Sequence, residues 1–127
     1  MGYRSEVAIV IHGKAEALHR HYDAYLSPEA NRVEAEDRYI LEQSVEIEES
    51  AHGDEKYAEF RFHCEDFKWY QSYSLVQLLE SFYKSSPDVG LSYEFLRVGE
   101  EDTDIEREDG GEESLYKLSM NRRIEFY

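Results

Sequence analysis

The chain has 127 residues, of which 29 are Asp or Glu and only 14 are Lys or Arg, so its formal net charge is −15. A charge of this sign and size excludes direct binding to nucleic acid or to an acidic membrane surface, and it favours a basic protein surface as partner. The length and the apolar fraction of 41% predict one folded domain over residues 1–127.

The single cysteine and the N-terminal segment indicate where the protein resides. Cys64 is alone, which excludes an internal disulfide and fits a reducing cytoplasm. The apolar run from Val7 to Ile11 has five residues, too few for a secretion signal or a membrane span. We therefore expect a cytoplasmic protein that does not enter a membrane.

The first third of the chain predicts a strand followed by helices. Residues 6–11 are apolar on alternate positions and nearly so on the others, which is typical of a central strand. After Gly13, apolar residues recur at helical spacing and predict an amphipathic helix over residues 14–26. Ser27 and Pro28 end that helix and can begin a short second one.

From Tyr39 the apolar period changes to two, which predicts a half-buried strand. Tyr39, Leu41, Val45 and Ile47 would face the core, and Glu42, Ser44, Glu46 and Glu48 would face outward. Residues 51–54 contain His52-Gly53-Asp54 and predict a turn. The next run, residues 57–64, alternates again, so the two strands predict a hairpin.

The second half predicts one more helix and two strands. Ser72 or Ser74 can cap a helix whose apolar stripe runs from Leu75 to Tyr83 and which Ser86-Pro87 ends. Residues 91–98 predict a fourth strand. Residues 116–126 alternate and predict a last strand that pairs with the fourth, with the acidic segment between them as the tip of the hairpin.

The predicted element order is therefore β-α-β-β-α-β-β. Its first six elements match the split βαβ, or ferredoxin-like, arrangement. We expect an α+β fold in which two helices cover one face of an antiparallel sheet.

Two acidic surfaces follow from this fold. Nine of the fourteen residues from Glu100 to Glu113 are acidic, and the strand carboxylates form a row on the outer sheet face. Alternate strand residues stand about 6.6 Å apart, which is near two phosphate steps of about 3.4 Å along a DNA strand. A plain solvent-facing sheet explains the row equally well. The predicted partner-binding residues are Glu42, Glu46, Glu48, Glu59, Glu100, Glu101, Asp102, Asp104, Glu106, Glu108 and Asp109.

Metal binding and catalysis find little support in the sequence. Asp102, Asp104 and Glu106 follow the 1-3-5 spacing of a calcium loop, but Arg107 occupies the position where the loop requires Gly. The histidines lack the spacing of a zinc helix. His63 and Glu65 flank Cys64, yet neighbouring strand residues face opposite ways, so they form no catalytic dyad. We expect no enzyme, no cofactor and no metal.

The segment Phe67-Lys68-Trp69-Tyr70 with Tyr73 is an aromatic cluster that leads into the later helix. Stacking platforms for bases come with basic grooves, and this chain has the opposite charge. Trp69 and Tyr70 are therefore expected to anchor the helix on the sheet. A hot spot for a protein partner is the alternative.

Several short motifs span most of the chain: Met1-Gly2-Tyr3-Arg4-Ser5-Glu6-Val7, Lys68-Trp69-Tyr70 with Tyr73, Tyr93-Glu94-Phe95, Arg97-Val98-Gly99-Glu100 and Asp104-Ile105-Glu106. At these motifs the chain resembles a group of small acidic bacteriophage and prophage proteins. The resemblance implies a phage origin and a bacterial host cell. Small acidic phage proteins often resemble inhibitors of host defence, including anti-CRISPR proteins and DNA mimics.

The function we expect is inhibition without catalysis. The acidic sheet face and tip would occupy the basic groove of a host nucleic-acid-binding defence protein as a nucleic-acid mimic, with a CRISPR effector as the expected partner. The alternatives are an accessory phage protein that binds through its aromatic surface, a small metal-binding domain, and adaptation of the surface to high salt.

Overall fold

The computed structural model describes residues 2–101, 103–121 and 123–126. The elements are β1 (Ser5–Lys14), α1 (Ala15–Tyr25), the 3-10 helix η1 (Pro28–Ala30), α2 (Ala35–Ser44), β2 (Val45–His52), β3 (Glu55–Phe67), α3 (Ser74–Ser85), the 3-10 helix η2 (Ser86–Val89), β4 (Ser92–Gly99), β5 (Ile105–Gly110), β6 (Leu118–Asn121) and β7 (Arg123–Phe126).

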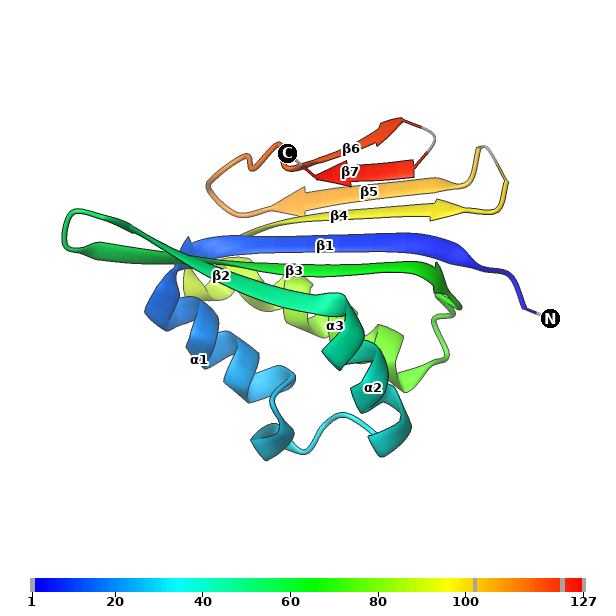
Figure 1. Cartoon of the computed structure of the whole chain (residues 1–127), viewed down its shortest axis with the longest axis horizontal. Helices are drawn as coiled ribbons and strands as arrows, with labels where there is room; N and C mark the ends of the chain where they lie inside the picture. Colours follow the sequence, from blue (N-terminus) through cyan, green and yellow to red (C-terminus); the bar gives the residue numbers. More distant parts are fainter. Residues whose placement is uncertain (1, 102, 122, 127) are drawn as a thin grey trace.

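The main sheet has five strands in the order β2-β3-β1-β4-β5, and every neighbouring pair is antiparallel. The three α-helices lie on one side of this sheet and the β6–β7 hairpin lies on the other (Figure 1). The predicted α+β class with an antiparallel sheet is confirmed. The main sheet has five strands, as predicted, but its fifth strand is β5 and not the segment of residues 116–126. A third α-helix and a separate two-stranded sheet go beyond the predicted arrangement.

The main core forms between the helices and the sheet. Val7, Ile9 and Ile11 of β1 are fully buried against this layer, while Ala8 and Val10 are buried on the opposite face. Burial on both faces explains why β1 is apolar at nearly every position and lies at the centre of the sheet. The apolar stripe of α3 is buried as predicted, although Tyr73, not a serine, occupies the N-cap position.

The prediction of a strand from Tyr39 is wrong for residues 39–44, which form the end of α2. Tyr39 is 67% exposed, whereas Leu41 is buried and Ile40 packs against the core. Ile40 and Leu41 are adjacent and both contact the core, so the helix does not keep the period of two on which the strand was predicted. The segment contains good helix formers and has Glu36 and Asp37 in its first turn, where they complement the helix dipole.

The prediction for the C-terminal third is also wrong in its pairing. Residues 105–110 of the acidic run form β5 and pair with β4, so that part of the run is an edge strand and not a hairpin tip. Residues 118–126 do not pair with β4 but form the β6–β7 hairpin. Leu118 and Ile124 of this hairpin are buried against Ala8, Val10 and Leu96, on the sheet face away from the helices.

Two carboxylates of the main sheet hold the hairpin in place. Glu94 Oε2 accepts hydrogen bonds from the backbone N–H groups of Lys117, at 2.7 Å, and Leu118, at 3.1 Å. Glu6 Oε1 accepts one from the backbone N–H of Ile124, at 3.0 Å. Both glutamate side chains are nearly buried, with 7% and 12% exposed. The hairpin thus covers the outer face of β1 and β4, whereas Glu46 and Glu48 of the predicted outer row stay exposed.

Candidate functional site

The acidic run is tied to the rest of the protein through Arg97 on β4. The Arg97 guanidinium, 10% exposed, contacts Asp104 Oδ1 at 2.7 Å and Glu106 Oε1 at 2.6 Å. It also donates to Ser5 Oγ at 2.9 Å. The guanidinium holds the pKa of the Asp104 carboxyl below its usual range, and the two carboxylates raise the pKa of Arg97. These charge-assisted bonds engage two of the predicted partner-binding carboxylates and compensate one of their two negative charges.

Other carboxylates of the run serve internal contacts too. Glu100 Oε1 accepts from the backbone N–H of Arg4 at 2.9 Å, and Tyr3 Oη donates to Asp104 at 2.7 Å. Glu108 accepts from Tyr83 Oη at 2.8 Å, and burial together with Glu108 raises the pKa of Tyr83. Glu101 and Asp109 are exposed. Asp102, also predicted to bind the partner, lies outside the described residues.

The calcium motif is not assembled as a loop of free ligands. Asp104 and Glu106 both face the Arg97 guanidinium, whose positive charge opposes cation binding at the same oxygens. Arg107 donates instead to the backbone O of Leu118, at 2.6 Å, and so joins β5 to the hairpin.

Two residues predicted for the outer row occupy other positions. Glu59 is 8% exposed and contacts Arg61 at 2.6 Å and Lys117 at 3.6 Å, so it offers no free carboxylate to a partner. Glu42 is exposed, but on helix α2 and not on a strand. The sequence alternation alone reveals neither the covering hairpin nor the helix.

Exposed carboxylates lie along and around β2, while others, among them Glu100, Glu101 and Asp109, are exposed in the acidic run. Strand β2 pairs only with β3, so it is an edge of the sheet. Glu49 contacts His19 at 2.5 Å, and Glu48 lies 3.9 Å from Arg61. We call this surface the acidic edge; its members, all exposed, are Glu42, Glu46, Glu48, Glu49, Asp54 and Glu55.

The aromatic cluster is mostly internal. Trp69 is 8% exposed and packs against the Phe67 ring and the Phe95 ring, each at 5.5 Å between centroids. Its predicted role as an anchor on the sheet is therefore confirmed. Tyr70 Oη accepts from the backbone N–H of Tyr3 at 2.6 Å, and Tyr73 remains 42% exposed.

A pocket of about 620 Å³ lies beside this cluster, between α2, the end of β3 and the start of α3. Its lining includes Arg4, Asp37, Ile40, Cys64 and Tyr73. Acidic, basic, apolar and thiol groups are mixed there, so the pocket indicates no particular ligand chemistry.

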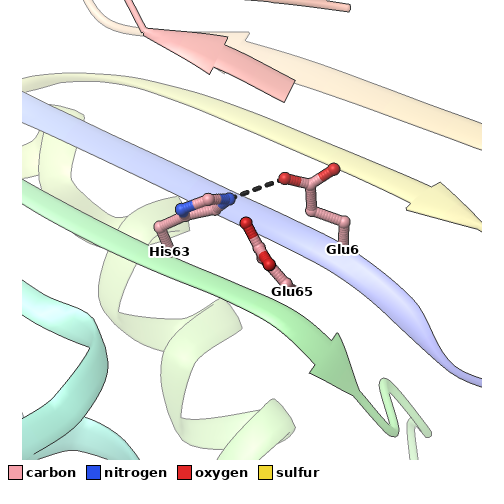
Figure 2. Close-up of side chains that lie close together, drawn as sticks. All are labelled: Glu6, His63 and Glu65. Atoms are coloured by element: carbon pink, nitrogen blue, oxygen red, sulfur yellow. Dashed lines mark hydrogen bonds and ion pairs between the residues drawn. The ribbon is translucent and has the colours of Figure 1, made fainter. Parts of the chain in front are cut away.

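A cluster of Glu6, His63 and Glu65 was missed by the sequence analysis. Glu6 lies on β1, and the other two lie on β3 (Figure 2). His63 Nε2 is 2.7 Å from Glu6 Oε2, and one ligand atom from each of the three residues lies within 4.8 Å of the others. The alternation of β3 places His63 and Glu65 on one face and Cys64 on the other, but no sequence signal identifies Glu6 as their neighbour.

No family model, curated protein or solved structure matches the chain. Within the described residues, no helix combines the length and the apolar character that crossing a membrane requires.

Proposed function

We propose that the protein is a phage-encoded inhibitor whose acidic edge occupies the basic nucleic-acid-binding groove of a host defence protein in the bacterial cytoplasm. The observation that supports it is the row of exposed carboxylates along the edge strand β2. The net charge of −15 would steer association with a basic groove. A CRISPR effector is the partner that the resemblance favours.

The geometry of the acidic edge suits mimicry of a phosphate backbone. Glu46 and Glu48 alternate on β2 and project from the same face, so their Cα atoms stand about 6.6 Å apart. Pairing with β3 along the whole of β2 fixes this spacing. A fixed row of charges loses less conformational entropy on binding than charges on a flexible tail.

The internal contacts of the acidic run narrow the proposed surface. Asp104, Glu106 and Glu108 already have partners within the chain, so their replacement would disturb the fold along with any binding. Glu46 and Glu48 can be changed with little effect on the core because both are exposed.

We also infer that the sheet order β2-β3-β1-β4 represents the split βαβ arrangement, to which α2, β5 and the β6–β7 hairpin have been added. Support comes from the place of β1 between β3 and β4 and from the antiparallel pairing throughout. This arrangement leaves β2 at an open edge.

The function can be tested by competition with nucleic acid. Purified effector loaded with labelled target DNA is titrated with wild-type protein, with Glu46→Lys/Glu48→Lys, and with Glu29→Lys/Glu112→Lys, in low and high salt. The control changes the net charge by the same amount at exposed residues that are not part of β2. We expect the first variant to compete at least about tenfold more weakly, with a smaller salt dependence.

Equal loss in both variants would mean that only total charge matters, which contradicts a specific acidic edge. Undiminished competition by Glu46→Lys/Glu48→Lys would overturn the proposal. Failure of the wild-type protein to displace DNA from any effector tested would exclude CRISPR effectors as the partner.

A further inference from the structure

The Glu6–His63–Glu65 cluster goes beyond the proposed inhibitor function. Its three side chains converge over β1 and β3 on the sheet face that carries the hairpin (Figure 2). The β1–β3 register pairs Val7 with Cys64 but Ser5 with Phe67, so β3 has an extra residue opposite Glu6. The register before the bulge, with Ala8 opposite His63 and Val7 opposite Cys64, already sets Glu65 opposite Glu6. The bulge lies beside this cluster, and bulges are common beside functional sites.

We propose that Glu6, His63 and Glu65 bind one divalent transition-metal ion of the Zn²⁺ type. The ligand atoms are Nε2 of His63, Oε2 of Glu6 and a carboxylate oxygen of Glu65. Zn²⁺ takes imidazole nitrogen and carboxylate oxygen at about 2.0–2.2 Å, and three protein ligands leave a coordination position open. Ca²⁺ and Mg²⁺ prefer oxygen alone, so the histidine selects against them.

The surroundings of Glu6 favour metal binding. Oε1 of Glu6 accepts from the backbone N–H of Ile124 at 3.0 Å, which orients the carboxylate and directs Oε2 toward His63. Outer-shell hydrogen bonds of this kind fix metal ligands and raise their affinity. The ring of Phe126 lies edge-on to the His63 ring, with 5.2 Å between centroids, and gives the site an apolar neighbour.

Access to the site is open on the side of His63. This residue lines a pocket of about 360 Å³ together with Gln43, Glu46, Arg61 and Phe126. The lining includes His63 but neither Glu6 nor Glu65, so the pocket borders the cluster on one side. Glu46 and Arg61 bring opposite charges to it.

A simple ion pair between His63 and Glu6 is the competing explanation of the 2.7 Å contact. A bound ion would separate these two atoms to about 3.4 Å, because both would then lie about 2.1 Å from the metal. The carboxylate of Glu65 distinguishes the two explanations, because an ion pair between His63 and Glu6 does not require it. The chain offers an internal comparison in His19 and Glu49, an exposed His–Glu pair.

Metal binding should also strengthen the docking of the hairpin. An ion held by Glu6 and by two residues of β3 restrains the carboxylate that accepts from Ile124. Since that bond joins the hairpin to the main sheet, Zn²⁺ should slow hydrogen exchange at the Ile124 amide. Adventitious binding at surface carboxylates would leave this amide unaffected.

The test is calorimetric titration of the full chain with ZnCl₂ in a buffer that does not chelate metals, combined with hydrogen exchange. The variants are His63→Ala and Glu65→Gln, and the control is His19→Ala/Glu49→Gln. We expect one Zn²⁺ per chain and an affinity at least about tenfold lower in each site variant, since loss of an outer-shell partner alone costs that much. The control should keep the wild-type affinity, and only proteins with an intact site should show slower exchange at Ile124.

Glu65 is exposed, so Glu65→Gln keeps the test valid even if His63→Ala weakens the hairpin. Wild-type affinity in Glu65→Gln, an equal loss in the control, or no slowing of exchange at Ile124 would each overturn the proposal. Co²⁺ in place of Zn²⁺ adds a spectroscopic check, because its visible absorption should change when Glu65 is replaced.

Discussion

At the scale of single residues, Arg97 explains why so acidic a segment is ordered. Its guanidinium lies beneath β5 and contacts two carboxylates from one side. Replacing Arg97 by an uncharged residue would leave the two negatively charged carboxylates close together without a cation between them. Arg97 therefore contributes to stability and not to a partner surface.

Replacement of Arg97 by Met should lower the free energy of unfolding by about 2 kcal/mol. The Met side chain retains much of the apolar contact but leaves Asp104 and Glu106 without the guanidinium that both contact. Urea unfolding at neutral pH measures the change. Arg20→Met is the control, because its pair with Glu16 is exposed on both sides and should be worth less than about 0.5 kcal/mol. Equal effects at the two positions would contradict the role assigned to Arg97.

His21 should give the fold a pH dependence. It is 6% exposed, and its Nε2 lies 2.7 Å from the backbone O of Phe82, to which it donates. Burial lowers the pKa of His21 below 6.5, more than the contacts with Phe82 and Asp88 raise it. The unfolded chain therefore takes up the proton first, so this residue's contribution to stability is complete above pH 6.5 and falls as the pH drops.

The His21→Gln variant should lose that part of the pH dependence. Urea unfolding between pH 5 and pH 8 should give a shallower decrease in acid for the variant than for the wild-type protein. Curves that stay parallel over this range would show that His21 is equally protonated in both states.

At the scale of elements, the β6–β7 hairpin depends on buried carboxylates as much as on apolar contact. Glu94 accepts two backbone N–H groups, and Glu6 accepts a third. Each bond to a charged acceptor is stronger than a neutral one, and an N–H left unpaired in the interface would be costly. These hydrogen bonds therefore attach the hairpin to β1 and β4.

Glu94→Ala should weaken the attachment of the hairpin to β4, because it removes the acceptor of two of these hydrogen bonds. We expect a loss of about 2 kcal/mol in the free energy that protects the Lys117 and Leu118 amides, measured by native-state hydrogen exchange. Amides in the centre of β1 should change less. Glu112→Ala removes an exposed carboxylate from the connection between β5 and β6 and should leave both amides protected.

The elements that the sequence predicts well are those whose period and burial agree. Residues 7–11, 58–64 and the stripe of α3 follow this rule. Residues 39–44 do not follow this rule, because they alternate as a strand does and yet form the end of α2. Strand β5 carries no apolar period, with residues Ile105 to Gly110 reading IEREDG, and its existence depends on the Arg97 contacts and on pairing with β4.

The candidate sites likewise contain residues that the local sequence pattern predicts and residues that it does not. The exposed positions of Glu46 and Glu48 follow from local alternation, which the sequence displays. The meeting of Glu6 with His63 depends on the register between two strands that are distant in the chain, and a single sequence does not encode register in any short motif. Pairing partners such as Arg97 and Asp104 remain hidden for the same reason.

At the scale of the whole molecule, the net charge of −15 opposes the compact state through self-repulsion. Part of this charge is compensated by the internal contacts of Arg97, Arg61 and Lys117, whereas the acidic edge keeps its charges exposed. Salt screens the exposed part most strongly.

Raising NaCl from about 20 mM to about 500 mM should therefore increase the free energy of unfolding, by an amount of the order of 1 kcal/mol. Choline chloride should act in the same way if screening is the cause, because its bulky cation does not bind carboxylates. A rise with NaCl alone would point to specific sodium binding. A chain that unfolds in low salt would instead indicate adaptation to high salt.

The central place of β1 also governs how fast the chain can fold. Ile9 pairs with Phe62 on one side and with Phe95 on the other, so neither ladder of the central strand is local. Closing such long loops costs conformational entropy before the strands pair and their contacts stabilise the sheet. Folding should therefore take milliseconds or longer, and until β4 arrives the apolar β1 presents an unpaired edge that a chaperone would recognise.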